Sequence, residues 1–321
     1  MDDPKLEINI LPAFHGDCIH LRFHSQGQCH NVVIDSGPGK HSAGFKRLMN
    51  GIRAAGEHVD LLCFTHMDDD HVLAAKHYFK TAENLDFVRQ IWINIPNDEV
   101  QRAQKLKAGT DELTGAEKTF ELFGHILRHG IPCKTEVLQG EKLYVGDMLI
   151  RAVLPTRELL TSYFDEWDKQ MEKTKLTDAQ SADDSDANGG SIVLVIEAMG
   201  NRLLFSGDAF APNLEAISGT WTGPNGFALV KLPHHGSNAN MSSSMLDAMN
   251  CRSFVISANG SMGRPAQKTV NILGQYGSEH GGVKLYGNYG WNDIDKVVGV
   301  TIKKLGAEPV PVTEGITLRT E

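Results

Sequence analysis

The chain has 321 residues, 41% of them hydrophobic, and a formal net charge of −9 at pH 7. This composition supports a large buried core and excludes a protein that coats nucleic acid through a broad basic surface. The sequence shows neither a secretory leader pattern nor an apolar run of about 18 residues, so we expect one soluble domain over residues 1–321 without a membrane segment.

Strand and helix patterns alternate along the first half of the chain. Apolar runs predict strands over 6–10, 18–23, 31–34, 59–65 and 88–93. Apolar residues at helical spacing predict helices over 44–55, 70–82, 99–107 and 116–129. This alternation is typical of an α/β protein.

The second half returns to strand patterns on both sides of a polar interval. We expect strands over 136–138, 143–144 and 149–154, followed by a mobile, acidic loop over 165–190 that is poor in apolar residues. Further strands are expected over 191–197, 202–206, 227–232, 253–256 and 284–286, with edge strands over 297–304 and 316–319.

A dense group of metal-ligating residue types follows the strand expected over 59–65. The hexapeptide reads His66-Met67-Asp68-Asp69-Asp70-His71. On an extended segment His66 and Asp68 point the same way, so both can bind one ion, and the turn that follows delivers Asp70 and His71 to a second ion. Asp69 is expected to be only a solvated neighbour. The spacing therefore predicts a site for two metal ions.

Two later strands also end in candidate ligands. The strand over 202–206 runs into Gly207-Asp208, and the strand over 227–232 runs into Pro233-His234-His235-Gly236-Ser237. A carboxylate can bridge two cations, and two-metal hydrolases hold these cations about 3.5–4 Å apart. We expect Asp208 to be the bridging ligand.

In this order, the motifs resemble those of the metallo-β-lactamase fold superfamily. Asp68 stands where most of the superfamily has histidine, and with Gly16-Asp17-Cys18 this makes the chain most similar to the hydrolase domain of ComEC-type competence proteins, without their membrane channel. The resemblance covers about residues 6–285 and implies a four-layer αββα sandwich. The residues that carry it are Asp35, His66 to His71, Ser206 to Asp208 and His234 to Ser237.

The resemblance also implies roles for individual residues. In the superfamily the ligand at the last motif is the residue before glycine, which is His235, and strand alternation would let only one of the two adjacent histidines face the metals. His234 either orients substrate phosphate or hydrogen-bonds to a neighbouring strand. Asp35 is expected to hold a ligand histidine in place. The implied metal ligands are His66, Asp68, Asp70, His71, Asp208 and His235.

Two positions depart from the family pattern. Segment 183–191 lacks the histidine that most of the superfamily has there, which leaves the ion of His66 and Asp68 short of a ligand and makes Asn188 a candidate extra contact. The chain has Arg264-Pro265 where ComEC-like relatives carry His-Pro, and Arg264 can pair with a phosphate. Ser237 and Asn238 can bind substrate oxygens, although such residues after a strand are turn formers first.

The ligand set predicts a metal-dependent hydrolase that uses a metal-bridging hydroxide. Oxygen-rich ligation favours two Mn²⁺ ions, with Zn²⁺ and Mg²⁺ left open. Asp70 or Asp208 would accept or position the proton of the water, and His234 completes the candidate catalytic set.

The expected substrate is a phosphodiester and possibly nucleic acid, which would make the chain a phosphodiesterase or nuclease. The first alternative is a small phosphoester, ester or amide, because one fold serves many substrates. The second is a partner-dependent or non-catalytic binding protein whose metals brace the fold. Five scattered cysteines without a Cys-x-x-Cys pair predict a cytoplasmic location. The sequence leaves the oligomeric state open.

Overall fold

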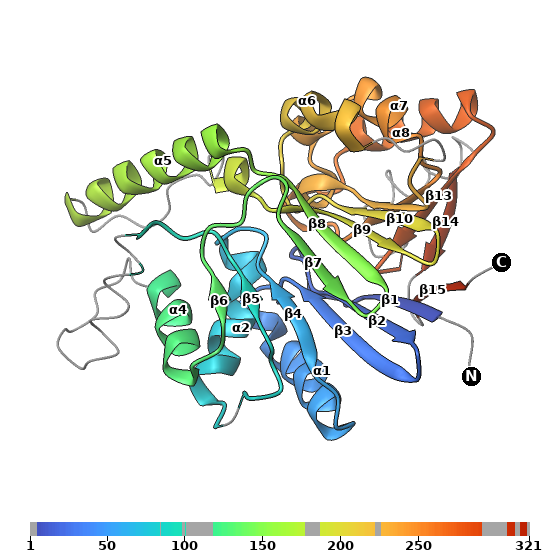
Figure 1. Cartoon of the computed structure of the whole chain (residues 1–321). Helices are drawn as coiled ribbons and strands as arrows, with labels where there is room; N and C mark the ends of the chain where they lie inside the picture. Colours follow the sequence, from blue (N-terminus) through green and yellow to red (C-terminus); the bar gives the residue numbers. More distant parts are fainter. Residues whose placement is uncertain are drawn as a thin grey trace.

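Two β-sheets lie face to face in this protein, and helices cover their outer faces (Figure 1). The computed structural model describes residues 5–83, 85–97, 100, 118–176, 187–221, 226–290, 307–311 and 315–319. Among these residues, no helix is both long and apolar enough to cross a membrane.

The first sheet has seven strands in the order β15-β1-β2-β3-β4-β5-β6. β3 and β4 are parallel, so their carboxyl ends lie at the same edge of the sheet. The strands are β1 (Lys5–Ile10), β2 (Ile19–Ser25), β3 (Gln28–Ile34), β4 (Val59–Cys63), β5 (Ile91–Trp92), β6 (Cys133–Lys134) and β15 (Ile316–Arg319). The helices on its outer face are α1 (Ser42–Ala54), α2 (Asp69–Thr81) and α4 (Lys118–His129).

The second sheet has eight strands in the order β14-β13-β12-β11-β10-β9-β8-β7. β10 and β11 are parallel, as are β11 and β12. The strands are β7 (Lys142–Val145), β8 (Met148–Leu154), β9 (Val193–Ala198), β10 (Asn201–Phe205), β11 (Leu229–Lys231), β12 (Ser253–Ile256), β13 (Val283–Gly287) and β14 (Ala307–Pro311). The helices on its outer face are α6 (Ala211–Trp221), α7 (Ser243–Met249) and α8 (Gln267–Glu279).

Three buried layers hold this architecture together, one between the sheets and one under each set of helices. Side chains alternate between the faces of a strand, and β9 shows the consequence: Val193 and Val195 face the outer helices, whereas Leu194 and Ile196 face the other sheet. Both faces of a central strand must then be apolar, which is why β9 reads as a continuous hydrophobic run. The αββα sandwich predicted from the sequence is confirmed.

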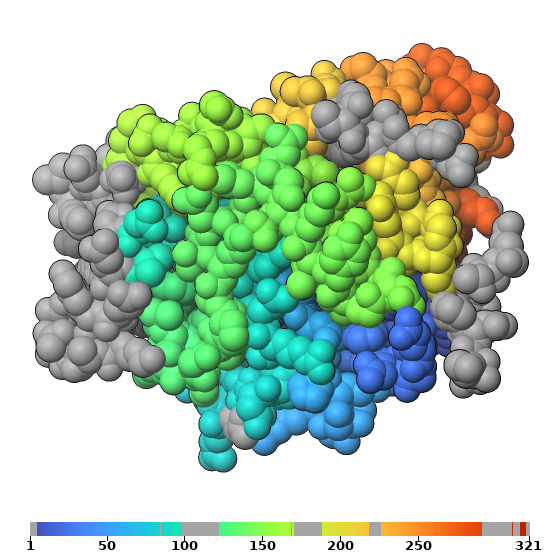
Figure 2. All heavy atoms as spheres, in the orientation of Figure 1, coloured from blue at the N-terminus to red at the C-terminus, as the bar shows by residue number. Residues whose placement is uncertain are grey.

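The acidic segment expected to be a loop over 165–190 is helical in its first part, so that prediction was wrong there. Helix α5 runs over Arg157–Leu176 and lies at the molecular surface (Figures 1 and 2). Its inner face carries Leu160, Tyr163 and Trp167 at helical spacing, and the Tyr163 and Trp167 rings pack edge to face with centroids 5.8 Å apart. Burial of these three side chains stabilises the helix, although its other face is polar.

Other differences are local. The strand expected over 136–138 is replaced by side-chain pairing: the Val137 N–H donates to Asn94 Oδ1 at 2.7 Å, and Asn94 Nδ2 donates to the Val137 carbonyl at 3.1 Å. Helices α6, α7 and α8 were not predicted. The helix expected over 99–107 and the strand expected over 297–304 lie outside the described residues. Short 3₁₀ turns complete the elements: η1 (Gly39–His41), η3 (Ala187–Gly190), η4 (Pro233–Gly236), η5 (Asn238–Asn240) and η6 (Ser261–Gly263).

Candidate metal centre

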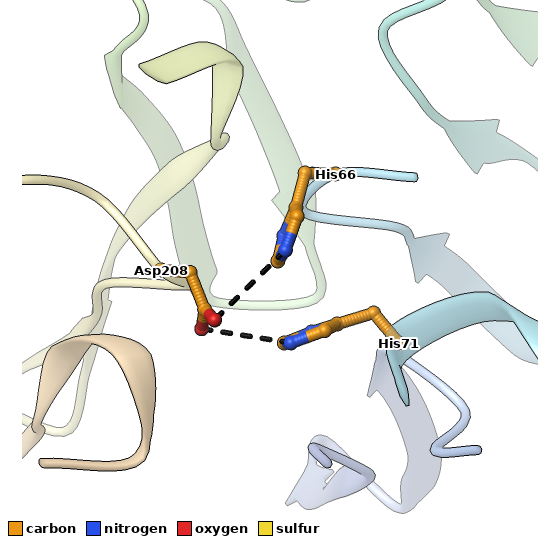
Figure 3. A group of neighbouring side chains, drawn as sticks. All are labelled: His66, His71 and Asp208. Atoms are coloured by element: carbon orange, nitrogen blue, oxygen red, sulfur yellow. Dashed lines mark ion pairs between the residues drawn. The ribbon is translucent and has the colours of Figure 1, made fainter. Parts of the chain in front are cut away.

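The candidate ligands lie at the carboxyl ends of parallel strands from both sheets. His66 follows β4 of the first sheet, and Asp208 follows β10 of the second. His71 lies in the first turn of α2, which begins at Asp69, within the hexapeptide. Figure 3 shows the side chains of His66, His71 and Asp208 pointing toward one another. The segment of the two histidines and that of Asp208 are far apart in the sequence.

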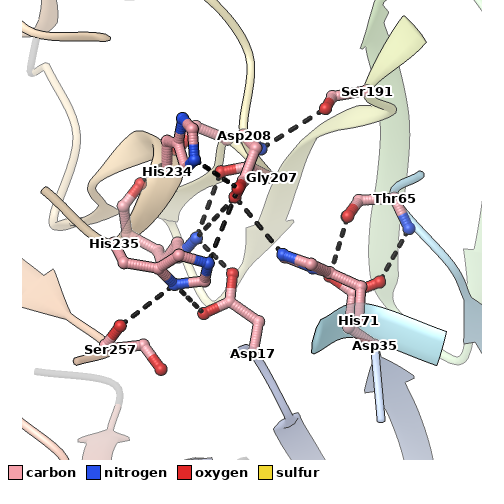
Figure 4. A network of polar contacts seen from close by, with 12 residues as sticks. Asp17, Asp35, Thr65, His71, Ser191, Gly207, Asp208, His234, His235 and Ser257 are labelled. Atoms are coloured by element: carbon pink, nitrogen blue, oxygen red, sulfur yellow. Dashed lines mark hydrogen bonds and ion pairs between the residues drawn. The ribbon is translucent and has the colours of Figure 1, made fainter. Parts of the chain in front are cut away.

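The two adjacent histidines occupy a turn in which both face the cluster. His234 has φ 48° and His235 has φ 55°, both in the left-handed region, so the alternation of an extended strand does not apply to them. His234 Nε2 lies 3.6 Å and His235 Nε2 3.5 Å from the same oxygen, Asp208 Oδ2 (Figure 4). The expectation that only one of the pair could face the metals is therefore wrong.

Four imidazole nitrogens surround the Asp208 carboxylate. Besides His234 and His235, His71 Nε2 lies 3.5 Å from Asp208 Oδ1, and His66 Nε2 lies 4.0 Å from Asp208 Oδ2. Ligands that share an ion at about 2.1 Å are separated by about 3–3.5 Å when the geometry is tetrahedral or octahedral. The observed spacings are close to that range.

The two remaining carboxylates of the hexapeptide flank this group. Asp68 Oδ2 lies 3.4 Å from His66 Nε2. Asp70 lies on the other side, with Oδ1 3.8 Å from His71 Nε2 and Oδ2 3.3 Å from His235 Nε2. Two overlapping groups of candidate ligands result. One contains Asp70, His71 and His235, and the other contains His66, His71 and Asp208.

In each of these histidines the other ring nitrogen, Nδ1, is held by a polar neighbour. His71 Nδ1 lies 2.9 Å from Asp35 Oδ2, and His235 Nδ1 lies 3.0 Å from the Ser257 carbonyl. For His66 and His234 the neighbours are Thr65 Oγ1 at 3.0 Å and Asn240 Oδ1 at 3.1 Å. Such contacts fix the ring and leave Nε2 free to bind a metal.

The free ring nitrogens fit a metal site because they lack any other partner. The Nε2 atoms of His66, His71 and His235 are buried and accept or donate no hydrogen bond within the described structure, and the same holds for Asp208 Oδ1. A buried polar atom without a partner is costly, and a cation coordinated there would remove that cost. These residues therefore fit the two divalent ions expected from the sequence.

A buried cation of the protein itself lies beneath this cluster. The Lys231 ammonium forms an ion pair with Asp17, lies 3.8 Å from Asp208 Oδ1, and donates to the Gly207 carbonyl at 3.1 Å. Both partners of the ion pair are 1% exposed. Asp17, Asp208 and His235 also have the spacing of a metal site, but Lys231 already supplies positive charge there.

The carboxylates change the pKa of the surrounding histidines. Burial lowers the pKa of His235, but the negative charges of Asp208 and Asp17 outweigh it and raise the pKa to about 9. Burial opposes ionisation of Asp208 too, yet the charges of His235 and His71 keep its pKa well below the usual value. His234 differs, because burial lowers its pKa to about 4 despite the opposing charge of Asp208. The centre is thus strongly negative and suited to cations.

Comparisons with known proteins give one family match and several similar solved structures. A sequence model of the metallo-beta-lactamase superfamily matches residues 26–181. Similar solved structures include the metallo-beta-lactamase fold protein YhfI from Bacillus subtilis, at 12% identity over 99% of each chain with a TM-score of 0.49. Another is Tm1679, a metal-dependent hydrolase of the beta-lactamase superfamily, at 10% identity over 98% of each chain with a TM-score of 0.45.

A third similar structure is CmlA, a diiron β-hydroxylase from Streptomyces venezuelae. It is 13% identical, and the match covers 99% of this chain and 55% of CmlA with a TM-score of 0.44. No curated protein matches the chain. The layers of the structure are those of an αββα sandwich. The metallo-beta-lactamase superfamily model matches just under half of the chain.

The match over 26–181 includes the hexapeptide but ends before Asp208 and the two histidines of the last motif. Their place in the centre rests on the geometry of the structure. Asp35 accepts from the Thr65 N–H and hydroxyl, both at 2.8 Å, and its Oδ2 lies 2.9 Å from His71 Nδ1.

The remaining predicted residues differ in how they are placed. Asn188 is 1% exposed, and its Nδ2 lies 3.3 Å from His234 Nδ1. Burial and, to a smaller extent, the positive charge of Arg264 lower the pKa of both His234 and His15. Among the described residues, no hydrogen bond or ion pair joins the Ser237 or Asn238 side chain to the cluster.

Sequence reasoning gave no role to several residues of this candidate centre. His15 was treated as an ordinary histidine, although the charges of Asp70 and His235 act on it. Asp17 entered only as part of a motif. Lys231 carried a signal of its own, because a lysine inside the apolar run 227–232 must find a partner when that strand is buried.

Replacing Asp35 with asparagine tests how far the ligand histidines depend on their supports. Asparagine keeps the shape of the side chain but removes the charge that faces His71 Nδ1. We expect metal affinity at the Asp70, His71 and His235 side to fall by about 10–100-fold. Titration of chelator-stripped protein with Zn²⁺ measures this, and unchanged affinity would show that Asp35 only braces the Thr65 loop.

Proposed function

We propose that this chain is a hydrolase that uses two divalent metal ions and that its substrate is a phosphodiester. The observation that carries the proposal is the convergence of four imidazole Nε2 atoms on one buried carboxylate, Asp208, at strand ends of both sheets. A purely structural cluster would satisfy these nitrogens internally, whereas three of them have no other partner in the described structure.

In this proposal Asp208 would contact both ions. His66 and Asp68 would help to hold the first ion, and Asp70, His71 and His235 would hold the second. When bound, two such ions lower the pKa of water and polarise the scissile group. We propose Mn²⁺ as the native metal and keep Zn²⁺ and Mg²⁺ as alternatives for the test below.

The residues of the chain would orient the substrate and move the proton. Burial raises the pKa of Asp70, but the charge of His71 outweighs it and keeps the pKa well below the usual value. Asp70 is therefore ionised at neutral pH and can accept a proton from the attacking water. Its 18% exposure leaves it open to the substrate side.

The rim of the centre supports an anionic substrate. Burial lowers the pKa of His15, and the positive charges of Arg264 and Lys40 lower it further, whereas the charge of Asp70 opposes this. Arg264 belongs to a segment tied to the metal turn, because the Ala266 N–H donates to the Gly236 carbonyl at 2.9 Å. A guanidinium at this position can bind a phosphate oxygen in two-pronged geometry.

The net charge of −9 bears on which kind of phosphodiester the protein can bind. Broad binding to duplex DNA needs many phosphate contacts from lysine and arginine, so we propose single-stranded nucleic acid, in keeping with the ComEC-like motifs. The acidic surface equally favours a small phosphodiester or phosphoester that contacts only the rim.

Cleavage assays with defined metals test the proposal. Chelator-stripped protein is supplied with Mn²⁺, Zn²⁺ or Mg²⁺ and given end-labelled single- and double-stranded DNA and RNA, together with bis(p-nitrophenyl) phosphate. We expect metal-dependent cleavage, with single strands preferred over duplexes. An Arg264→Ala variant should raise KM for these anions while its metal content stays unchanged.

The outcomes discriminate among the alternatives. If the protein hydrolyses bis(p-nitrophenyl) phosphate and single-stranded DNA does not inhibit this reaction, the substrate is a small molecule. Hydrolysis of p-nitrophenyl acetate but of no phosphodiester would refute the phosphodiester assignment and leave an ester hydrolase. Two bound ions without any hydrolysis would favour a binding protein that metals brace.

A further inference from the structure

A cavity of about 530 Å³ lies beside the loop over 11–18, which joins β1 to β2. Its volume is typical of a small-molecule site. The lining comes from that loop, from β1 and β2, and from the segment where η1 runs into α1. We propose that this cavity binds one nucleotide of a single-stranded nucleic acid, with its phosphate at Lys40 and Arg47 and its base against Phe14. The inference rests on the proposed phosphodiesterase function and names a subsite for its substrate.

The cavity carries positive charge in a protein whose net charge is −9. Lys40 and Arg47 line it, and no aspartate or glutamate of the described chain does so. Both residues are exposed, and within the described ranges no carboxylate forms an ion pair with either of them. Cations without a carboxylate partner favour an anionic ligand, and a guanidinium can bind a phosphate in two-pronged geometry.

A buried histidine at the same cavity lacks a partner for one ring nitrogen. His41 is 6% exposed, and its Nε2 is buried and forms no hydrogen bond with the part of the chain that the structure describes. His41 directly precedes α1, whose first turn has no acidic residue and no side-chain cap. Anions are stabilised at such a helix end. A phosphate at the start of α1 would therefore supply the partner that His41 Nε2 lacks.

Other lining residues suit a planar, apolar group. Leu11 and Phe14 both line the cavity and are partly exposed. Phe14 has φ 61°, in the left-handed region that such side chains rarely adopt, and its N–H donates to the Tyr289 hydroxyl at 2.6 Å. This conformation costs free energy, and proteins retain such strain mainly at functional sites. An aromatic ring beside cations is the combination that binds a base together with its phosphate.

The loop that lines the cavity also packs against the candidate metal centre. Two residues after Phe14, a Cβ at Gly16 would lie 1.9 Å from the Asp70 carbonyl oxygen and 2.8 Å from Pro38, which precedes η1. No side chain fits at that junction, so loop and metal-binding segment are in direct contact. Two residues of chain span at most about 7 Å. The cavity wall and Asp70 are thus close enough for one strand to reach both.

Nucleotide binding to metal-free protein tests the cavity without any catalysis. Chelator-stripped, full-length protein is titrated with AMP, ribose 5-phosphate and inorganic phosphate in a calorimeter. We expect AMP to bind about 10-fold more tightly than ribose 5-phosphate, because only AMP has a base that can stack. Arg47→Ala should weaken AMP and phosphate by about 10-fold or more, because a charge-assisted hydrogen bond is lost.

Two further variants make the binding test specific. Lys46→Ala removes an exposed cation of the same helix that does not line the cavity, so it should bind all three ligands like wild type. Phe14→Leu should weaken AMP by about 10-fold and leave phosphate binding unchanged. Circular dichroism compares the folding of each variant. If Phe14→Leu misfolds, the comparison of AMP with ribose 5-phosphate in wild-type protein still tests the base.

Competition in metal-loaded protein links the cavity to the hydrolytic site. AMP should inhibit cleavage of a single-stranded oligonucleotide competitively. Arg47→Ala should raise the inhibition constant of AMP by about 10-fold, and Lys46→Ala should leave it unchanged. AMP that bound only at the metal ions would inhibit both variants equally, so the two sites are distinguished.

Three results would overturn the inference. The first is AMP that fails to bind metal-free protein, or binds it with an affinity that Arg47→Ala does not change. The second is ribose 5-phosphate that binds as tightly as AMP. The third is AMP that binds at the cavity without competing with the oligonucleotide, which would indicate a site for a free nucleotide. Each leaves the proposed function standing if bis(p-nitrophenyl) phosphate is still hydrolysed. Wild-type protein that hydrolyses no phosphodiester would instead remove the proposed function and the strand subsite together, even if AMP binds.

Discussion

Replacing Asp208 with alanine is expected to abolish metal-dependent hydrolysis. The carboxylate lies within 3.5–4.0 Å of four imidazole Nε2 atoms and is 2% exposed, and alanine offers no oxygen that could bind an ion in its place. A two-metal centre contributes several kcal/mol to transition-state stabilisation, and its loss corresponds to a rate decrease of at least about 10³-fold. Initial rates with bis(p-nitrophenyl) phosphate measure the effect.

A neighbouring carboxylate gives a matched control for this variant. Asp69→Ala removes an exposed side chain of the same hexapeptide, and we expect activity and metal content close to wild type. Metal analysis of the Asp208 variant should show fewer than two bound ions. Full activity of Asp208→Ala with normal metal content would refute the bridging role.

Replacing Lys231 with methionine is expected to destabilise the protein strongly. Lys231 and Asp17 form an ion pair in which each partner is 1% exposed, and burial that would lower the pKa of Lys231 is outweighed by the charges of Asp17 and Asp208, which raise it. Removing one partner leaves the other charge buried alone, which typically costs about 3–5 kcal/mol of unfolding free energy. Urea unfolding of chelator-stripped protein measures the loss.

The double variant separates the ion pair from general disruption of the core. In Asp17→Asn combined with Lys231→Met neither charge remains, so the loss should be clearly smaller than the sum of the two single losses. The Asp208 charge, 3.8 Å from Lys231, limits the recovery in the metal-free protein. Strictly additive losses would show that Asp17 and Lys231 do not depend on each other.

Much of the fold follows from local patterns in the chain. Strand β4 and helix α2 occur where apolar spacing placed them, within one to two residues at most boundaries. The exceptions are instructive. In α5, Leu160, Tyr163 and Trp167 form a narrow apolar stripe that average composition conceals, and at Val137 a side-chain amide from Asn94 replaces strand pairing.

The candidate site was predictable where the spacing of the ligands is short. The hexapeptide and Gly207-Asp208 could be recognised because each ligand follows a strand by a fixed number of residues, and backbone geometry then sets its direction. The orientation of His234 could not be predicted. His234 and His235 have φ 48° and φ 55°, so the alternation of side chains along an extended strand does not apply to them.

The sequence by itself predicted the alternation of strands and helices and a set of candidate metal ligands, because both depend on periodicity and spacing among near neighbours. The four-layer sandwich was expected from the resemblance to a known family. Only the tertiary structure decided which buried groups become partners. Lys231 meets Asp17, and Asn240 holds His234 against Asp208, through contacts between different strands and turns. Such pairings depend on the packing of two sheets against each other, and no local sequence pattern predicts them.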